Sequence, residues 1–62
     1  MEKKAVNSRV KEELRKNNVK VWQLADALGV SEMSVYRYMR HELPMEEQER
    51  YIHLIRNKAA EQ

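Results

Sequence analysis

Residues 24–38 read LADALGVSEMSVYRY, and the pattern in this stretch decides the fold. Apolar residues recur three or four positions apart on both sides of Gly29, which predicts one helix over residues 20–28 and another over residues 32–40. Gly29 stands where the end of a helix favours a positive φ. Ser31 is a typical N-cap residue for the helix that follows. The sequence therefore predicts two short helices in immediate succession.

Only Gly29, Val30 and Ser31 separate these helices, and so short a connection makes them cross steeply. A steep crossing needs a small side chain where the backbones meet, and Ala25 lies one turn before Gly29. Val35 is placed to pack the later helix onto the earlier one. This arrangement is a helix-turn-helix. We expect its core to consist of Leu24, Ala25, Leu28, Gly29, Val30, Val35 and Tyr38.

A further helix is predicted over residues 7–17, where valine and leucine recur every four positions and charged residues fill the other faces. Either Asn7 or Ser8 is expected to cap its start. The pair Asn17-Asn18 is expected to end it, because asparagine tolerates the left-handed conformation. Residues 1–4 are expected to be a frayed start.

The last helix is predicted over residues 44–57 or longer, with a proline at its beginning and with Ile52 and Ile55 facing the core. Trp22 is expected to pack between the first and second helices. The whole pattern predicts an all-α fold, in which residues 1–62 form a single compact domain of four helices, or of five, around the helix-turn-helix.

The composition describes a short chain rich in charge. Its 62 residues suffice for one domain, and 35% of them are charged, which is typical of a solvated surface. The chain has no cysteine, which excludes a disulfide and a thiolate zinc site and suits a cytoplasmic location. Apolar residues never run longer than two in succession, so we expect neither a membrane span nor a secretory signal. Residues 1–41 carry a net charge of +4 and residues 42–62 one of −2, which favours the first two thirds of the chain for any polyanion.

The central stretch is similar to the helix-turn-helix of the Cro/phage-repressor family, whose members typically read LAxxLGVSxxxVxR. Leu24-Ala25, residues 28–31, Val35 and Arg37 match this pattern. The resemblance implies a lambda-repressor-like fold, a bacterial or phage origin, and binding to double-stranded DNA through the third helix, which enters the major groove. The chain departs from the family at Val21, where many members have a glutamine that contacts phosphate. It also leaves little length for the fifth helix that many members use to dimerise.

The resemblance also implies which residues contact DNA. With Val35 and Tyr38 turned inward, the helical repeat turns the opposite side of the third helix toward the groove. Arg37 suits guanine O6 and N7, and Glu32 suits the amino group of cytosine. The candidates for base contacts are Glu32, Met33, Tyr36, Arg37 and Arg40, and those for phosphate contacts are Lys20, Gln23, Ser31 and Ser34. The alternative is an ordinary exposed helix face, for which Met33 and Tyr36 are unusual residues.

These features predict a small sequence-specific transcriptional regulator that contacts bases through helix 31–40. Two alternatives stay open: an excision or architectural DNA-binding factor of a mobile element, and a protein-interaction module that kept the fold without DNA binding. The second is favoured by Glu32, whose carboxylate would face phosphates. We expect no enzymatic activity, no cofactor, no metal and no small-molecule ligand. One glycine cannot form a phosphate-binding loop, and His41 and His53 lie on separate elements without companion ligands at a recognised spacing.

The fourth helix leaves both a weak homodimer and a monomer open. A symmetric dimer needs a self-complementary apolar patch. With Ile52 and Ile55 inward, we expect Leu54 and either Met45 or Tyr51 to stay exposed, and these three are the candidate dimer contacts. In the monomer, the fourth helix simply closes the core.

Overall fold

The computed structural model describes residues 6–61, and within this range the chain forms four α-helices and no strand. They are α1 (Ser8–Lys16), α2 (Val21–Leu28), α3 (Glu32–Tyr38) and α4 (Met45–Glu61). The prediction of an all-α domain is confirmed, with four helices rather than five in the described range. The frayed start expected at residues 1–4 lies outside the described residues.

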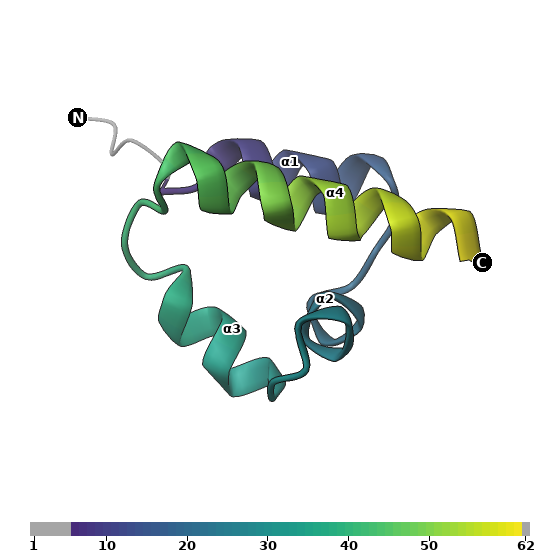
Figure 1. Cartoon of the computed structure of the whole chain (residues 1–62), viewed down its shortest axis with the longest axis horizontal. Helices are drawn as coiled ribbons and strands as arrows, with labels where there is room; N and C mark the ends of the chain where they lie inside the picture. The colour runs from purple at the N-terminus through teal and green to yellow at the C-terminus, as the bar shows by residue number, and fades with distance from the viewer. Residues whose placement is uncertain (1–5, 62) are drawn as a thin grey trace.

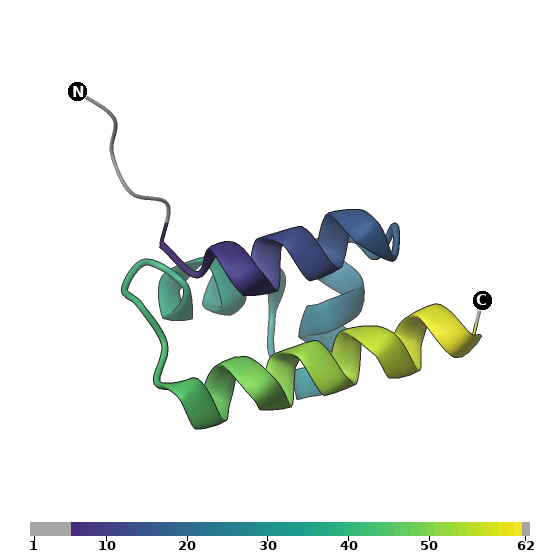
Figure 2. The same ribbon diagram turned by 90° about the horizontal axis from the view of Figure 1, so that it is seen from above.

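The helices are arranged in two layers. α1 and α4 lie side by side and run in the same direction, and α2 and α3 lie on one side of this pair (Figure 1; Figure 2). α4 packs against both α1 and α2, and α2 packs against α3. The radius of gyration is 11.3 Å, close to the roughly 10.6 Å typical of a compact chain of this length. The long α4 is therefore the element that joins α1 to the α2–α3 pair.

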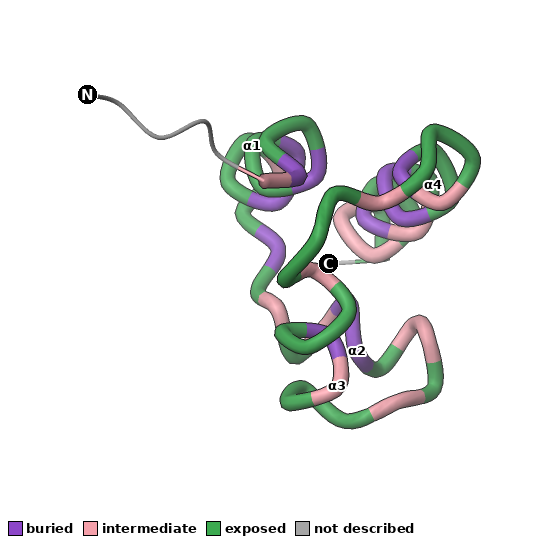
Figure 3. Tube along the Cα trace, turned by 90° about the vertical axis from the view of Figure 1, so that its left-hand side faces the viewer, coloured by how far each residue is buried: buried purple, intermediate pink, exposed green. Residues whose placement is uncertain are grey.

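The core lies where the two layers meet. Its buried apolar residues are Val10, Leu14, Val19, Leu24, Ala25, Val35, Tyr51, Ile52 and Ile55. In Figure 3 the buried stretches of α1 and α4 lie on the sides that face each other. Ile52 and Ile55 point inward as predicted, and burying a side chain of this size stabilises the fold by about 1.5–3 kcal/mol. The burial of Val19 was not predicted; it follows Asn18, which ends α1 with a φ of 55°.

Asn7 precedes α1 but does not cap it as predicted. Its backbone is left-handed (φ 56°) and its side chain is fully buried. The amide Nδ2 donates to the carbonyls of Met39 (3.0 Å) and His41 (2.9 Å), and Oδ1 accepts from the N–H of Leu43 (2.7 Å). If α3 continued, the N–H of Leu43 would donate directly to the carbonyl of Met39, four positions earlier. The side-chain amide of Asn7 instead binds both of these groups. This placement accounts for the end of α3 before residue 40.

Two more side chains hold the loop between α3 and α4. The backbone N–H of Asn7 donates to Oε1 of Glu42 (2.9 Å). Nε2 of the buried Gln48 donates to Oε2 of Glu42 (3.0 Å) and to the carbonyl of Leu43 (2.7 Å). The loop is therefore attached to the starts of both α1 and α4.

Glu13 is an exception to the expectation that charged residues fill the outer faces of α1, because only 7% of it is exposed. Its Oε2 accepts hydrogen bonds from Nε of Arg56 (2.8 Å) on α4 and from Nδ2 of Asn17 (3.1 Å). The hydrogen bond from Arg56 lowers the pKa of Glu13 below 4.5, and this effect outweighs burial, which raises it. An ion pair thus connects α1 to α4.

Candidate nucleic-acid interface

The turn between α2 and α3 has the local structure that its sequence predicts. Gly29 has a φ of 75°, and a Cβ built on it meets no atom within 4 Å. A side chain would therefore fit the space, and glycine is favoured here because of its positive φ. Oγ of Ser31 accepts from the N–H of Ser34 (3.2 Å), which confirms the predicted N-cap. The N–H of Val30 donates to the carbonyl of Ala25 (3.0 Å). Backbone and side-chain hydrogen bonds thus fix the turn at both ends.

The predicted motif core is buried or half-buried at Leu24, Ala25, Leu28, Val30 and Val35. Gly29 was also predicted to belong to this core, but it is exposed because it lies in the turn. Tyr38 was predicted to point inward, and this prediction is wrong because 45% of it is exposed. Tyr38 lies three positions after Val35, which turns its side chain about 60° to one side of the buried face. Met39, the next residue along the chain, is half-buried in its place.

Four of the predicted base-contacting residues form the exposed face of α3: Glu32, Met33, Tyr36 and Arg37. Met33 is 69% exposed and Tyr36 is 55% exposed. The Tyr36 hydroxyl donates to Oε2 of Glu32, one turn earlier (3.3 Å). The face therefore offers a thioether, an aromatic ring, a guanidinium and a carboxylate, which are groups able to contact base edges.

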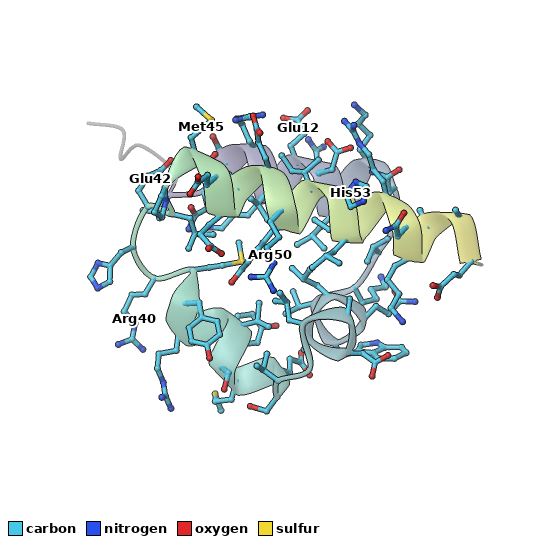
Figure 4. All side chains as sticks on the ribbon, viewed as in Figure 1. Glu12, Arg40, Glu42, Met45, Arg50 and His53 are labelled. Atoms are coloured by element: carbon cyan, nitrogen blue, oxygen red, sulfur yellow. The ribbon has the colours of Figure 1, made fainter. Side chains whose placement is uncertain are left out.

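Arg40 does not belong to this face. It was predicted to end α3, but it lies in the turn beyond the helix, where its N–H donates to the carbonyl of Arg37 (3.3 Å). Figure 4 shows its side chain pointing away from the body of the molecule. Arg40 therefore lies beyond the end of α3 and not on the helix as predicted, while its side chain is exposed as predicted, and its contact with a base stays a prediction.

The predicted phosphate-contacting residues lie at the starts of α2 and α3. Lys20 is exposed, and its backbone N–H donates to Oε1 of Gln23 (2.8 Å), so the oxygen of this amide is already engaged. The donor Nε2 of Gln23 is the atom suited to a phosphate. The hydroxyls of Ser31 and Ser34 lie 3.1 Å apart and bond to each other.

Trp22 does not pack between α1 and α2 as predicted, because 57% of it is exposed. It lies two positions before Leu24, which turns the indole about 200° from that buried residue around α2. The wide apolar ring thus lies on the outer side of α2.

Lys11 lies beside the exposed face of α3, which the sequence did not predict. A depression of about 180 Å³ between α1, α2 and α3 is lined by Lys11, Leu14, Val21, Tyr36 and Met39. Lys11 therefore brings a positive charge next to Tyr36. In the sequence it is one of several charged residues on the first helix, and the position of α3 determines which of them lies nearby.

Of the two alternatives predicted for an exposed residue of α4, Met45 is the exposed one, and only 4% of Tyr51 is exposed. Tyr51 lies four positions before Ile55 and so shares the inward stripe of the helix. Burial raises the pKa of its hydroxyl, and the nearby carboxylate of Glu47 adds to this effect. Met45 is exposed, with Nη1 of Arg9 donating to its sulfur (3.0 Å), and Leu54 is half-buried.

No three histidine, aspartate or glutamate side chains within residues 6–61 converge closely enough to hold a metal ion. None of the helices in the described range is both long and apolar enough to cross a membrane. Comparisons with protein-family models, curated proteins and solved structures find no match to this chain. The inference of function therefore depends on the residues of this chain alone.

Proposed function

We propose that this protein binds double-stranded DNA sequence-specifically, with α3 in the major groove, and acts as a small transcriptional regulator. The observation that carries the proposal is the exposed face of α3, with Met33, Tyr36 and Arg37 on a short helix anchored by the buried Val35. The similarity of residues 24–38 to the Cro/phage-repressor family supports the same conclusion. In a helix-turn-helix, such a helix lies in the major groove with its N-terminal residues against the base edges.

The chemistry of each residue gives it a separate role in the proposed complex. Arg37 donates two hydrogen bonds to guanine O6 and N7, and Met33 and Tyr36 pack on thymine methyl groups. Lys20 and Nε2 of Gln23 hold phosphates. Lys11 extends the positively charged surface onto α1.

The test is a gel-shift titration on random-sequence DNA, followed by selection of preferred sites from a random pool. We expect binding whose logarithmic affinity falls linearly with the logarithm of salt concentration, by about 0.9 for each phosphate contact on duplex DNA. Trp22, the only tryptophan, is largely exposed and provides a fluorescence signal for the same titration. Absence of binding at low salt would contradict the proposal.

The protein-interaction alternative is favoured by one observation: the exposed carboxylate of Glu32 stands in the first turn of α3. If the chain binds no DNA at low salt, this alternative replaces the proposal. If DNA is bound, a nuclease footprint separates the two DNA-binding functions. A regulator protects an operator at a promoter, whereas an excision factor protects the ends of a mobile element.

A further inference from the structure

An open groove of about 420 Å³ lies between the α2–α3 unit and α4. Its lining consists of Leu28, Val30, Tyr38, Leu43, Glu47, Arg50 and Tyr51. Tyr38 lines this groove, whereas Tyr36 lines the depression beside Lys11. Because these two tyrosines are about 200° apart around α3, the groove lies on the other flank of the helix from that depression. A protein bound to DNA through α3 therefore leaves the groove accessible.

The groove combines a protruding side chain with a hollow. Tyr38 is 45% exposed at its wall, while Tyr51 is buried and forms its floor. Leu28, Val30 and Leu43 are half-buried around this floor and keep some apolar surface open. A patch with an aromatic knob next to an apolar hole is complementary to a copy of itself turned by a two-fold rotation.

The charges on the rim have the same self-complementarity. Arg50 and Glu47 lie on adjacent turns of α4, with 3.6 Å between Nη1 and Oε1, and the side chain of Arg50 is exposed while that of Glu47 is half-buried. Figure 4 shows the side chain of Arg50 reaching from α4 toward α2 and α3. One acid and one base on a patch give it no net charge. A two-fold axis that passes between Glu47 and Arg50 places each carboxylate opposite the guanidinium of the other protomer.

We propose that this groove is the site at which a second copy of the chain docks, with Tyr38 of each protomer seated in the groove of the other. This surface replaces the one expected from Met45, Tyr51 and Leu54. Because only one side chain of each protomer enters the groove, we expect an interface below the roughly 1,200 Å² of a standard stable complex and a dimer that forms weakly in the absence of DNA. Its use rests on the proposed function: two copies present two α3 helices to half-sites about 34 Å apart.

Sedimentation equilibrium without DNA tests the docking surface directly, at protein concentrations from about 10 μM to 1 mM, a range that captures weak association. We expect association of the parent chain and a dissociation constant raised about tenfold or more in Tyr38→Ala. Because 45% of Tyr38 is exposed and it lies outside the buried core, we expect this variant to keep its fold, and a thermal melt checks that it does. A monomer at every concentration, or equal association of parent and variant, overturns the proposal.

The rim charges give a second, independent test. Arg50→Glu alone weakens association, and the double variant Glu47→Arg with Arg50→Glu restores it, because the exchange recreates the opposite charges across the two-fold axis. Glu49→Arg is the matched control, since Glu49 lies on the same helix but lines a different hollow, facing α1. Weakening by Glu49→Arg as large as that by Arg50→Glu, or no rescue in the double variant, contradicts docking through the groove.

Failure of this inference is distinguishable from failure of the proposed function. A monomeric chain that still binds DNA with strong salt dependence overturns the dimer and leaves DNA binding intact. A chain that dimerises through Tyr38 and binds no DNA at low salt confirms the surface and overturns the proposed function. Association that Leu54→Glu abolishes and Tyr38→Ala does not affect also overturns the groove as the docking site.

Discussion

Arg37 and Lys20 carry the same charge but occupy different places on the proposed interface. Arg37 is exposed on α3, the helix proposed to contact bases, whereas the exposed Lys20 immediately precedes α2 and is proposed to contact phosphate. We expect Arg37→Ala to cost about 1–3 kcal/mol of binding free energy at the preferred site and to relax the preference at one base pair. We expect Lys20→Ala to weaken all sequences alike and to lower the salt dependence.

Titrations of the two variants on the selected site and on random-sequence DNA measure this difference. Each variant serves as the control for the other, because both remove one positive charge. Equal losses on specific and random DNA in Arg37→Ala would show that its guanidinium contacts phosphate and not a base.

The ion pair of Glu13 with Arg56 predicts a pH dependence of stability. The folded state lowers the pKa of Glu13, so its contribution to stability is complete above about pH 4.5 and is lost as the pH falls through the lowered value. Urea denaturation between pH 7 and pH 3 therefore shows a decline that is smaller in Glu13→Gln. Glu12→Gln, at an exposed neighbouring position, is the control. A decline of the same size in Glu13→Gln and the parent would rule out this origin.

The directions of single side chains show where the sequence stops being informative. Buried aliphatic residues such as Leu24 and Val35 follow the helical repeat and were predicted. Trp22 and Tyr38 were misplaced, because a large apolar ring favours burial in general while its angular position on a short helix turns it outward. Glu13 was misplaced because its partner Arg56 is 43 positions away in the sequence.

At the scale of the helices, the sequence predicted those helix ends that depend on residues next to them in the chain. It did not predict the end of α3, which depends on a residue far away in the sequence. Gly29, Ser31 and Asn18 act on the backbone next to them, and their geometry is as expected. The end of α3 depends on Asn7, which is 32 positions from Met39 in the sequence and hydrogen-bonds to its carbonyl. No local pattern contains that information.

The crossing of α2 and α3 predicts that Ala25 tolerates no larger side chain. Ala25 is 3% exposed, and its carbonyl accepts from the N–H of Val30 in the turn. We expect Ala25→Leu to lower the free energy of unfolding by about 1–3 kcal/mol through overpacking, a large share of the stability of so short a domain. Thermal and urea denaturation measure the loss. Ala60→Leu, on an exposed position of α4, is the matched control, and similar melting of Ala25→Leu and the parent would contradict a tight crossing.

For the whole molecule, the hydrogen bonds among Asn7, Glu42 and Gln48 form a polar junction. This junction connects α1, the loop after α3 and the start of α4, and the hydrophobic pattern of the sequence does not predict these connections. Asn7 contacts the loop after α3, and Glu42 and Gln48 connect that loop to α4. The exposed face of α3 therefore keeps its position relative to α1 through hydrogen bonds at one end and through the buried Val35 in its middle. This fixed position would matter for the proposed binding of α3 in the major groove, because small displacements of a contacting residue weaken its hydrogen bonds.

Substitutions of Asn7 test whether its two donors hold this junction. Asn7→Ala removes the partner of two part-buried carbonyls and of one part-buried N–H, and we expect a loss of about 1–3 kcal/mol in unfolding free energy. Asn7→Asp keeps the acceptor for Leu43 but turns a carboxylate oxygen toward the carbonyls of Met39 and His41, so its loss at neutral pH is larger.

Acidification separates the loss of the Asn7 donors from the cost of burying a carboxylate. The buried carboxylate of Asn7→Asp has a raised pKa, so the stability of this variant recovers relative to Asn7→Ala as the pH falls below that value, because the protonated group can donate again. Urea denaturation at pH 7 and pH 4 measures the recovery, and Asn57→Asp, at an exposed position of α4, is the control for adding a charge. If Asn7→Asp is as stable as the parent at pH 7, the donors of Asn7 do not hold the junction.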